Sequence, residues 1–219
     1  VTAAIKLLKR AENTAKGHGG LALMHKIFST LSYVNLTTKN YNTALNYAEK
    51  ARGMATRANN DLWMAYSLSY IANAYSGLGV PDSNLNYLLK ALKLYKHLDT
   101  ESQTVLLANI SDVYSQKGDT VKSAKFILRA LKERPDSYTY TILTDLYMRQ
   151  GQYQKAFDLL QKALASDDVY TREKALYNLF KLKQKMGDYV GAANTADSLL
   201  IFKEKQQKEW QANKVYEIQ

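Results

Sequence analysis

The sequence contains no cysteine, which excludes disulfides, thiolate metal sites and cysteine nucleophiles. Two prolines and ten glycines in 219 residues are few, whereas alanine, leucine, lysine and glutamine are plentiful. This composition favours helix throughout the chain. No apolar run approaches the ~20 residues that a membrane-spanning helix needs, so we expect no span within the chain. The absence of cysteine is compatible with an oxidising or a reducing compartment.

Motifs for catalysis are also missing. Histidine occurs at only three well-separated positions, and the sequence has no HExxH, GxSxG or P-loop motif. The glycines of Gly17–Gly20 are not followed by Lys-Ser or Lys-Thr, so they indicate a helix C-cap and not a phosphate loop. Asp119 and Asp188 follow turn glycines and are interpreted as helix caps. We therefore expect no enzymatic activity, no metal and no cofactor.

The chain does contain a repeat. The spacing in Tyr147–Leu164 predicts the end of one helix, a turn at Gln150–Gln152 and a second, amphipathic helix. The residue types of this stretch recur at intervals of 33 to 40 residues. Because one hairpin cannot bury its apolar face alone, successive hairpins must stack. The recurring small positions are Ala44, Asn84, Ser123, Ala156 and Ala192, and the closing alanines are Ala51, Ala91, Ala130 and Ala163.

Turn and cap residues divide the chain into predicted helices. Pro81 suits the first turn of a helix that continues to His97, and Asp61 is predicted to cap the helix before it. The first segment has the spacing of a second helix whose partner is missing, which predicts that the chain is part of a longer protein. The predicted helices are Val1–Lys16, Leu21–Thr38, Tyr41–Arg57, Leu62–Leu78, Pro81–His97, Ser102–Lys117, Val121–Arg134, Asp136–Gln150, Tyr153–Ala165, Val169–Met186 and one from Val190 onward.

This pattern resembles the tetratricopeptide repeat, whose degenerate signature combines a leucine, a small residue and a tyrosine with alanines on the following helix. The resemblance covers Val1–Leu200. It implies an all-α, right-handed α-solenoid of five hairpins with a leading half-repeat and a C-terminal helix. We expect one domain over residues 1–200 and a polar helical extension or linker over 201–219. The leucine-like positions are Leu31, Ile71, Ile110, Leu143 and Leu179, the small ones Ser32, Ala72, Ser111 and Thr144, and the tyrosines Tyr75, Tyr114 and Tyr147.

The same resemblance implies a binding surface. In tetratricopeptide arrays the first helix of each hairpin lines a concave groove, and residues between the packing positions point into it. Asparagine amides can donate to and accept from a peptide backbone, and tyrosine offers apolar area with a polar tip. The implied ligand is therefore a protein or peptide. The groove positions in this sequence are Lys26, Tyr33, Tyr66, Tyr70, Asn73, Asn109, Asp112, Tyr138, Asp145, Arg149, Tyr177, Asn178 and Lys181.

Two further considerations limit what these residues are expected to bind. Many of the 17 tyrosines can be packing residues between helices, and Tyr75, Tyr114 and Tyr147 are interpreted in that way. The chaperone-binding subclass clamps a C-terminal carboxylate with lysine and asparagine. Asn73 and Asn109 match only part of that clamp, so we do not predict that ligand.

The formal net charge is +10, and this basic surplus leaves several partners open. It is compatible with a nucleic-acid or polyanion binder, with a position near an anionic membrane, or with a solvated exterior. Helical repeats that read one base each need near-constant spacing, so the varying period argues against nucleic acid as the ligand. The lysines that concentrate toward the C-terminus are Lys174, Lys181, Lys183, Lys185, Lys203, Lys205 and Lys208.

The stretched repeats and the final SLLIFKEKQQKEWQANKVYEIQ are similar to the sensor regions of Bacteroidetes membrane-tethered regulators. This second resemblance implies the interaction or sensory module of a larger signalling or transcriptional regulatory protein. It also implies an extracytoplasmic location, with tethering through a part that follows this chain. The alternative is a soluble adaptor or assembly scaffold without a membrane connection.

Overall fold

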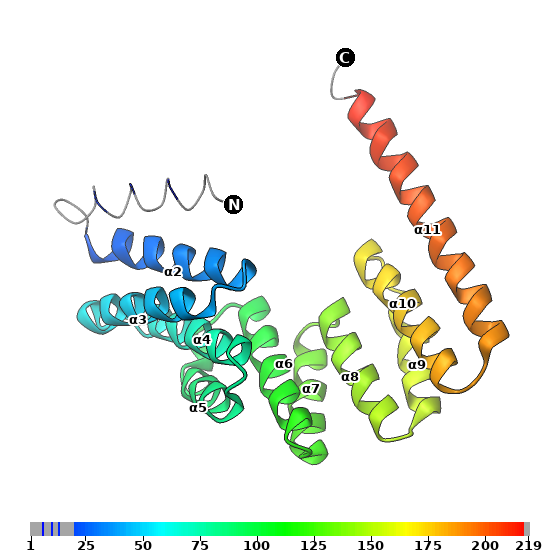
Figure 1. Ribbon diagram of the computed structural model, residues 1–219, viewed down its shortest axis with the longest axis horizontal. Helices are drawn as coiled ribbons and strands as arrows, with labels where there is room; N and C mark the ends of the chain where they lie inside the picture. The colour runs from blue at the N-terminus through cyan, green and yellow to red at the C-terminus, as the bar shows by residue number, and fades with distance from the viewer. Residues whose placement is uncertain (1–5, 7–9, 11–12, 14–19, 217–219) are drawn as a thin grey trace. The chain divides into compact units, whose positions relative to one another are not determined.

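The computed structural model describes residues 20–216, together with residues 6, 10 and 13. All regular structure in the described part is helical, as the composition predicts (Figure 1). The predicted half-repeat at Val1–Lys16 lies outside the continuously described residues. The helices are α2 (Leu21–Thr37), α3 (Tyr41–Ala58), α4 (Asp61–Gly77), α5 (Pro81–Leu92), the 3₁₀ turn η1 (Tyr95–His97), α6 (Thr100–Gln116), α7 (Thr120–Glu133), α8 (Ser137–Arg149), α9 (Tyr153–Leu164), α10 (Val169–Lys185) and α11 (Tyr189–Tyr216).

The helices form two compact units, residues 1–117 (unit 1) and 118–219 (unit 2). In unit 1, each of the helices α2 to α5 packs on the next one along the chain. In unit 2, the same holds from α7 to α11. First helices of successive hairpins also meet, because α2 contacts α4 and α8 contacts α10. The predicted all-α arrangement of stacked hairpins is confirmed.

The hairpin turns explain why glycine recurs between paired helices. Gly79, Gly118, Gly151 and Gly187 all adopt positive φ, between 69° and 80°. This left-handed conformation is costly for residues with a Cβ. The first hairpin places Lys39 in the same conformation, with φ 60°. A glycine is therefore preferred at this turn but not indispensable.

Small residues lie where the helices cross closely. The recurring positions Ala44, Ser123 and Ala156 are fully buried, and Asn84 and Ala192 are 6% and 3% exposed. A larger side chain there would push the helices apart. The four closing alanines are also fully buried. Large apolar side chains fill the spaces beside them, and those at the leucine-like positions are Leu31, Ile71, Ile110, Leu143 and Leu179.

The tyrosines interpreted as packing residues are half-buried in the structure. Tyr75 stacks on Tyr87 with the ring centroids 5.6 Å apart. Tyr147 packs against the core of unit 2 beside Leu160 and Leu179. Both rings therefore pack within their units, Tyr75 between α4 and α5 and Tyr147 against the core of unit 2.

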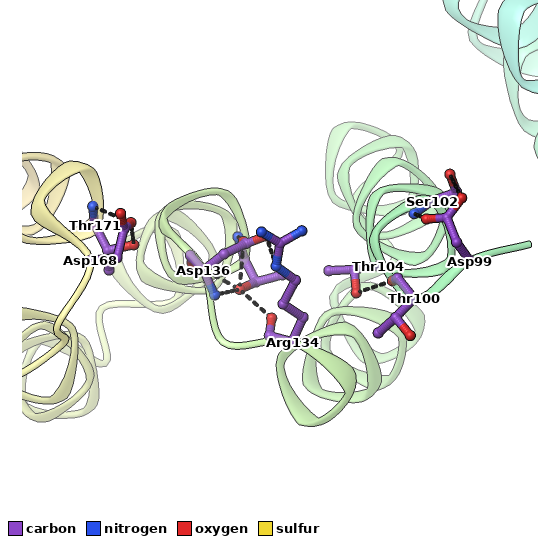
Figure 2. A network of polar contacts seen from close by, with 9 residues as sticks. Asp99, Thr100, Ser102, Thr104, Arg134, Asp136, Asp168 and Thr171 are labelled. Atoms are coloured by element: carbon purple, nitrogen blue, oxygen red, sulfur yellow. Dashed lines mark hydrogen bonds and ion pairs between the residues drawn. The ribbon is translucent and has the colours of Figure 1, made fainter.

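Acidic side chains cap the first helices of several hairpins (Figure 2). Asp99, Asp136 and Asp168 each accept a backbone N–H from the residue three positions later, at 2.8–2.9 Å, at the starts of α6, α8 and α10. Such a cap satisfies an N–H group that has no partner within the helix. The prediction that Asp61 caps α4 is wrong. Asn60 is the cap and accepts from the Trp63 N–H at 3.0 Å, which leaves Asp61 as the first helical residue.

The prediction of one helix from Pro81 to His97 is also wrong. The α-helix ends at Leu92, and the chain tightens into η1, where the N–H of His97 donates to the carbonyl of Leu94. The amide of Gln103 donates to the carbonyls of Tyr95 and Leu98, at 3.0 and 2.9 Å. A side chain from the next helix thus holds the turn that follows α5, a contact between elements that periodicity does not reveal.

The last helix runs without a break from Tyr189 to Tyr216 and extends well past α10 in Figure 1. It remains in contact with α10 as far as residue 203. Phe202 lies under the guanidinium of Arg172, 5.9 Å from it, and Lys203 pairs with Glu173 at 3.2 Å. The domain boundary predicted at residue 200 stays a prediction.

Candidate functional site

Unit 1 contains two neighbouring hollows, lined mainly by α2, α4 and α6, the first helices of their hairpins. The larger has a volume of about 880 Å³ and the smaller about 520 Å³. Tyr33, Tyr66 and Tyr70 line both hollows, so their rings form a shared wall. We call the two hollows together the unit 1 groove.

Two tyrosines of the wall, Tyr66 and Tyr70, have raised pKa values. Burial raises the pKa of Tyr70, and the neighbouring Tyr33 hydroxyl adds to this effect. Burial also raises the pKa of Tyr66, and its hydrogen bond to Asp99 raises it further. At neutral pH the wall therefore combines uncharged aromatic faces with hydroxyl groups that can donate or accept hydrogen bonds.

Asp99 places a negative charge at one end of the larger hollow. Its carboxylate accepts the Tyr66 hydroxyl at 2.6 Å, the Ser102 N–H at 2.8 Å and the Ser102 hydroxyl at 2.9 Å. These hydrogen bonds, led by the one from Tyr66, lower the pKa of Asp99 to about 2. The carboxylate is thus ionised throughout the physiological range. The other charged residue that lines this hollow is Glu101, so its charges are acidic.

Two asparagine side chains meet on the floor of the same hollow. The Asn109 amide on α6 donates to the Asn73 carbonyl oxygen on α4 at 3.3 Å. Each amide has more than one donor and acceptor position, so the pair can also bond to a ligand backbone. These two predicted residues, far apart in sequence, are brought together because the first helices lie side by side.

The smaller hollow has a flat aromatic side. The His25 ring stacks on Trp63, with centroids 4.9 Å apart and the planes 13° from parallel. His25 is 6% exposed and lies within 3.5 Å of the hydroxyls of Ser67 and Ser29. Burial lowers its pKa, although a hydrogen bond with the Trp63 carbonyl partly opposes this. The neutral ring therefore extends the apolar surface. The predicted residue Lys26 also lines this hollow.

Unit 2 has its own hollow of about 290 Å³, between α8 and α10, which we call the unit 2 groove. The predicted residues Tyr138, Tyr177, Asn178 and Lys181 line it. The buried Asn178 amide donates to the Thr141 hydroxyl at 2.9 Å, which joins α10 to α8. Asn178 occupies the same repeat position as Asn109 of unit 1 and, like it, donates to a side chain of the preceding first helix, although the acceptor lies one helical turn earlier in the repeat.

The other predicted residues line none of the three hollows. Asp112 accepts a hydrogen bond from Gln116 on its own helix at 2.8 Å. Asp145 lies 3.8 Å from the ammonium of Lys181, at the edge of the unit 2 groove. Arg149 is the last residue of α8 and is exposed.

Sequence reasoning missed several residues that line the grooves. Asp99 lies before α6, outside any helical periodicity, and its side chain is oriented by cap geometry. Trp63 on α4 was not predicted as a groove residue. Its ring turns toward α2 and stacks there on His25, a contact that the sequence does not show. Tyr170 and Lys174 could have been found, because they precede Tyr177 and Lys181 by two helical turns. Lys174 had been assigned only to the basic cluster.

The lysines of that basic cluster have different partners in the structure. Lys183 donates to the Gly191 carbonyl at 3.2 Å and so supports the last hairpin. Lys203 and Lys205 pair with Glu173 and Glu209, at 3.2 and 3.9 Å. The predicted single basic region is therefore partly neutralised, which leaves Lys174 and Lys181 as the cations that line a hollow.

The residues that the structure describes contain no group of three or more histidine, aspartate or glutamate side chains placed to hold a metal. Within the same part of the chain, no helix combines the length and apolarity required to cross a membrane.

Stacked helical hairpins with grooves along their first helices define a helical-repeat protein. Residues 139–172 match the family model of the tetratricopeptide repeat. No curated protein matches the chain by sequence. Many solved structures do match by fold. The chain therefore contains a tetratricopeptide repeat and has the tetratricopeptide-like fold, which confirms the resemblance seen in the sequence.

Three of these structures illustrate the likeness. BtubC (BKLC) from P. vanneervenii has a TM-score of 0.74 at 15% identity, over 94% of this chain and 90% of its own. The putative kinesin light chain TPR-like repeats of Podosopora anserina give 0.67 at 16%, over 84% and 96%. A Rap protein complexed with competence and sporulation factor gives 0.65 at 17%, over 94% and 70%. At these identities the likeness shows the fold alone.

Proposed function

We propose that the chain is a non-catalytic protein- or peptide-binding module and that the unit 1 groove holds an extended peptide segment. The observation that carries this proposal is the wall of Tyr33, Tyr66 and Tyr70 between two hollows, with the Asn73–Asn109 pair at its foot. A groove with mainly apolar walls and a few convergent polar groups is the usual form of a ligand site.

The geometry supports different roles for the two hollows and for the asparagine pair in binding a peptide. Successive side chains of an extended peptide point to opposite sides, so neighbouring side chains can enter the two hollows on either side of the tyrosine wall. The amides of Asn73 and Asn109 can then bond to the peptide backbone. Tyrosine rings bury a large apolar area while losing little conformational freedom. Affinity would therefore come from the rings and orientation from the amides.

The chain's place in a larger protein is a second part of the proposal. We infer that it serves as the interaction or sensory part of a signalling or transcriptional regulatory protein. The unbroken α11 supports this role, because a single helix of 28 residues in contact with α10 can transmit a displacement of the last hairpin along its axis. The Rap protein in complex with competence and sporulation factor shows that a partner can be held by a protein of this fold.

Selection from a displayed library of random dodecapeptides tests the binding proposal directly. We expect enriched peptides that bind the purified chain, and we expect the double variant Tyr70→Ala, Asn109→Ala to bind them at least tenfold more weakly. The matched control is Tyr189→Ala with Asn194→Ala, which removes the same two side-chain types from exposed positions outside the hollows. Circular dichroism and the melting temperature verify that both variants are folded.

Two results would contradict the proposal. One is a selection that enriches no peptide above the background of an unrelated helical protein. The other is an equal loss of binding in the groove variant and the control variant, because the hollows would then contribute nothing specific.

A further inference from the structure

The unit 2 groove carries a regular stripe of tyrosine and lysine. Tyr170, Lys174, Tyr177 and Lys181 follow one another on α10 at intervals of four, three and four residues, which places all four on one helical face. The Lys174 ammonium lies 5.2 Å from the centroid of the Tyr170 ring, and that of Lys181 lies 5.7 Å from the centroid of Tyr177. Each cation is thus supported by the aromatic face one turn before it.

The aromatic part of this surface is open. Tyr138 on α8 is 40% exposed, and Tyr170 and Tyr177 on α10 are 56% and 48% exposed. Burying tyrosine rings against a partner is favourable, and aromatic residues are enriched in the buried parts of interfaces. Three exposed tyrosines around one hollow therefore mark a contact surface.

The charge of the surface is positive. Lys174 and Lys181 are the charged residues that line the hollow, and no carboxylate lines it. Lys181 has Asp145 at 3.8 Å, a long ion pair in an exposed position. Among the described residues Lys174 has no carboxylate within ion-pair distance, because the adjacent Glu173 pairs with Lys203. A partner that supplies carboxylates would complete the set of charges.

We propose that the unit 2 groove binds an acidic peptide segment of a partner protein, with carboxylates on Lys174 and Lys181 and the intervening peptide on the tyrosine rings. Seven residues of helix separate the two lysines by about 10.5 Å along the axis. In a polyproline II segment, residues three apart lie on one face about 9.3 Å apart. The spacing therefore favours acidic residues at positions i and i+3 of an extended segment. This proposal rests on the proposed peptide-binding function and specifies the ligand of unit 2.

Fluorescence anisotropy with synthetic peptides tests the proposal on the whole chain. The probe is a rhodamine-labelled Glu-Ser-Pro-Glu-Ser-Pro-Glu peptide, and its control replaces each Glu by Gln. We expect the Glu peptide to bind at least tenfold more tightly than the Gln peptide. The double variant Lys174→Gln, Lys181→Gln should weaken the Glu peptide at least tenfold and leave the Gln peptide unchanged, while Tyr177→Ala should weaken both.

The matched control is Lys162→Gln with Lys185→Gln. It removes the same charge from exposed positions of unit 2 that do not line the groove. A loss below twofold in this control supports a local site. An equal loss in both double variants would show that only the net charge matters, and it would overturn the proposal.

Two further outcomes also overturn it. One is equal binding of the Glu and Gln peptides. The other is tighter binding of a labelled ten-residue oligothymidylate that is lost in the Lys174→Gln, Lys181→Gln variant, because the groove would then be a nucleic-acid site. Failure of the acidic peptide alone, with peptides selected on the unit 1 groove still bound, would leave the proposed function in place and remove only the specificity assigned here.

Discussion

The two units use the same frame of hairpins to build grooves that differ in charge. The larger hollow of the unit 1 groove is lined by the acidic Asp99 and Glu101, whereas the unit 2 groove is lined by Lys174 and Lys181. Both units nevertheless contain more lysine and arginine than aspartate and glutamate. The charge of a groove is thus set by a few positions on the first helices and in the loops before them. The net charge of the unit does not predict it.

The two grooves also share a type of hydrogen bond, although their charges differ. In each, an asparagine on one first helix donates to a polar side chain on the preceding first helix, Asn109 to Asn73 in unit 1 and Asn178 to Thr141 in unit 2. A scaffold of this type can therefore change its ligand by substitution of exposed groove residues while its core remains unaltered.

Breaking the core of one unit should have the largest effect. Leu160 is fully buried in unit 2, so Leu160→Ala should lower the free energy of unfolding by about 2–5 kcal/mol. Leu128→Ala is the matched control, because Leu128 is 48% exposed, and its effect should stay below about 1 kcal/mol. Urea denaturation monitored by circular dichroism measures both. Similar effects of the two substitutions would contradict the burial seen here.

Substitution of residues in one groove should weaken binding at that groove and leave binding at the other groove unchanged. Tyr70→Ala should weaken peptides selected on unit 1 about tenfold, a change of about 1.4 kcal/mol, and leave the acidic probe of unit 2 unaffected. Lys174→Gln with Lys181→Gln should have the reverse effect. Anisotropy titrations of both peptides with both variants give this comparison. If each variant weakened both peptides equally, the grooves would not be independent sites.

The hairpin turns offer a smaller test. Lys39 of unit 1 has the left-handed conformation that glycines adopt at the other turns. Lys39→Gly should remove about 1–2 kcal/mol of backbone cost and lose roughly 0.5–1 kcal/mol through the greater freedom of the unfolded chain. We therefore expect a net stabilisation of up to about 1.5 kcal/mol, and the reverse substitution Gly151→Ala should destabilise unit 2. Thermal melting of the two variants measures both signs. Destabilisation by Lys39→Gly would mean that the lysine side chain is itself required.

The smallest effect concerns the acidic end of the unit 1 groove. Because the pKa of Asp99 is lowered to about 2 in the folded protein, its contribution to stability is present above the ordinary value of 3.8 and is lost as the pH falls toward 2. The difference in stability between the wild type and Asp99→Asn should therefore shrink between pH 5 and pH 2. Asp99 is exposed, so the effect should remain below about 1 kcal/mol.

Urea denaturation across this pH range measures the difference. Tyr66→Phe removes the leading cause of the shift while it retains the carboxylate, and it should reproduce part of the effect. A difference that does not change with pH would show that the Tyr66–Asp99 bond does not stabilise the ionised carboxylate.

Much of the fold could be predicted from the sequence because it depends on local and periodic signals. The turn glycines Gly79, Gly118, Gly151 and Gly187 mark the hairpins, and their left-handed conformation in the structure favours glycine. The recurring alanines are buried as the repeat frame indicates. Predictions failed at helix ends. The helix after Pro81 ends at Leu92, and Gln103 of the next helix holds the turn that follows it; the cap of α4 is Asn60, one residue before the predicted Asp61.

In the candidate site, too, some residues could be predicted from the sequence and some contacts could not. The resemblance to the tetratricopeptide repeat implied groove positions at Tyr33, Tyr66, Tyr70, Asn73 and Asn109, and these residues line one hollow in the structure. It could not show that Tyr66 bonds to Asp99 or that His25 stacks on Trp63, because those contacts join residues more than 30 positions apart. Tyr170 and Lys174 were not predicted as groove residues, although their spacing from Tyr177 and Lys181 contained the signal.

By itself, the amino-acid sequence determined the helices, the hairpin turns and the frame of small residues in which they pack, because each depends on neighbours within one or two helical turns. Only the tertiary structure decided the character of the two grooves. Their charge and depth arise where side chains from successive first helices meet, so they depend on how each hairpin lies against the next within its unit.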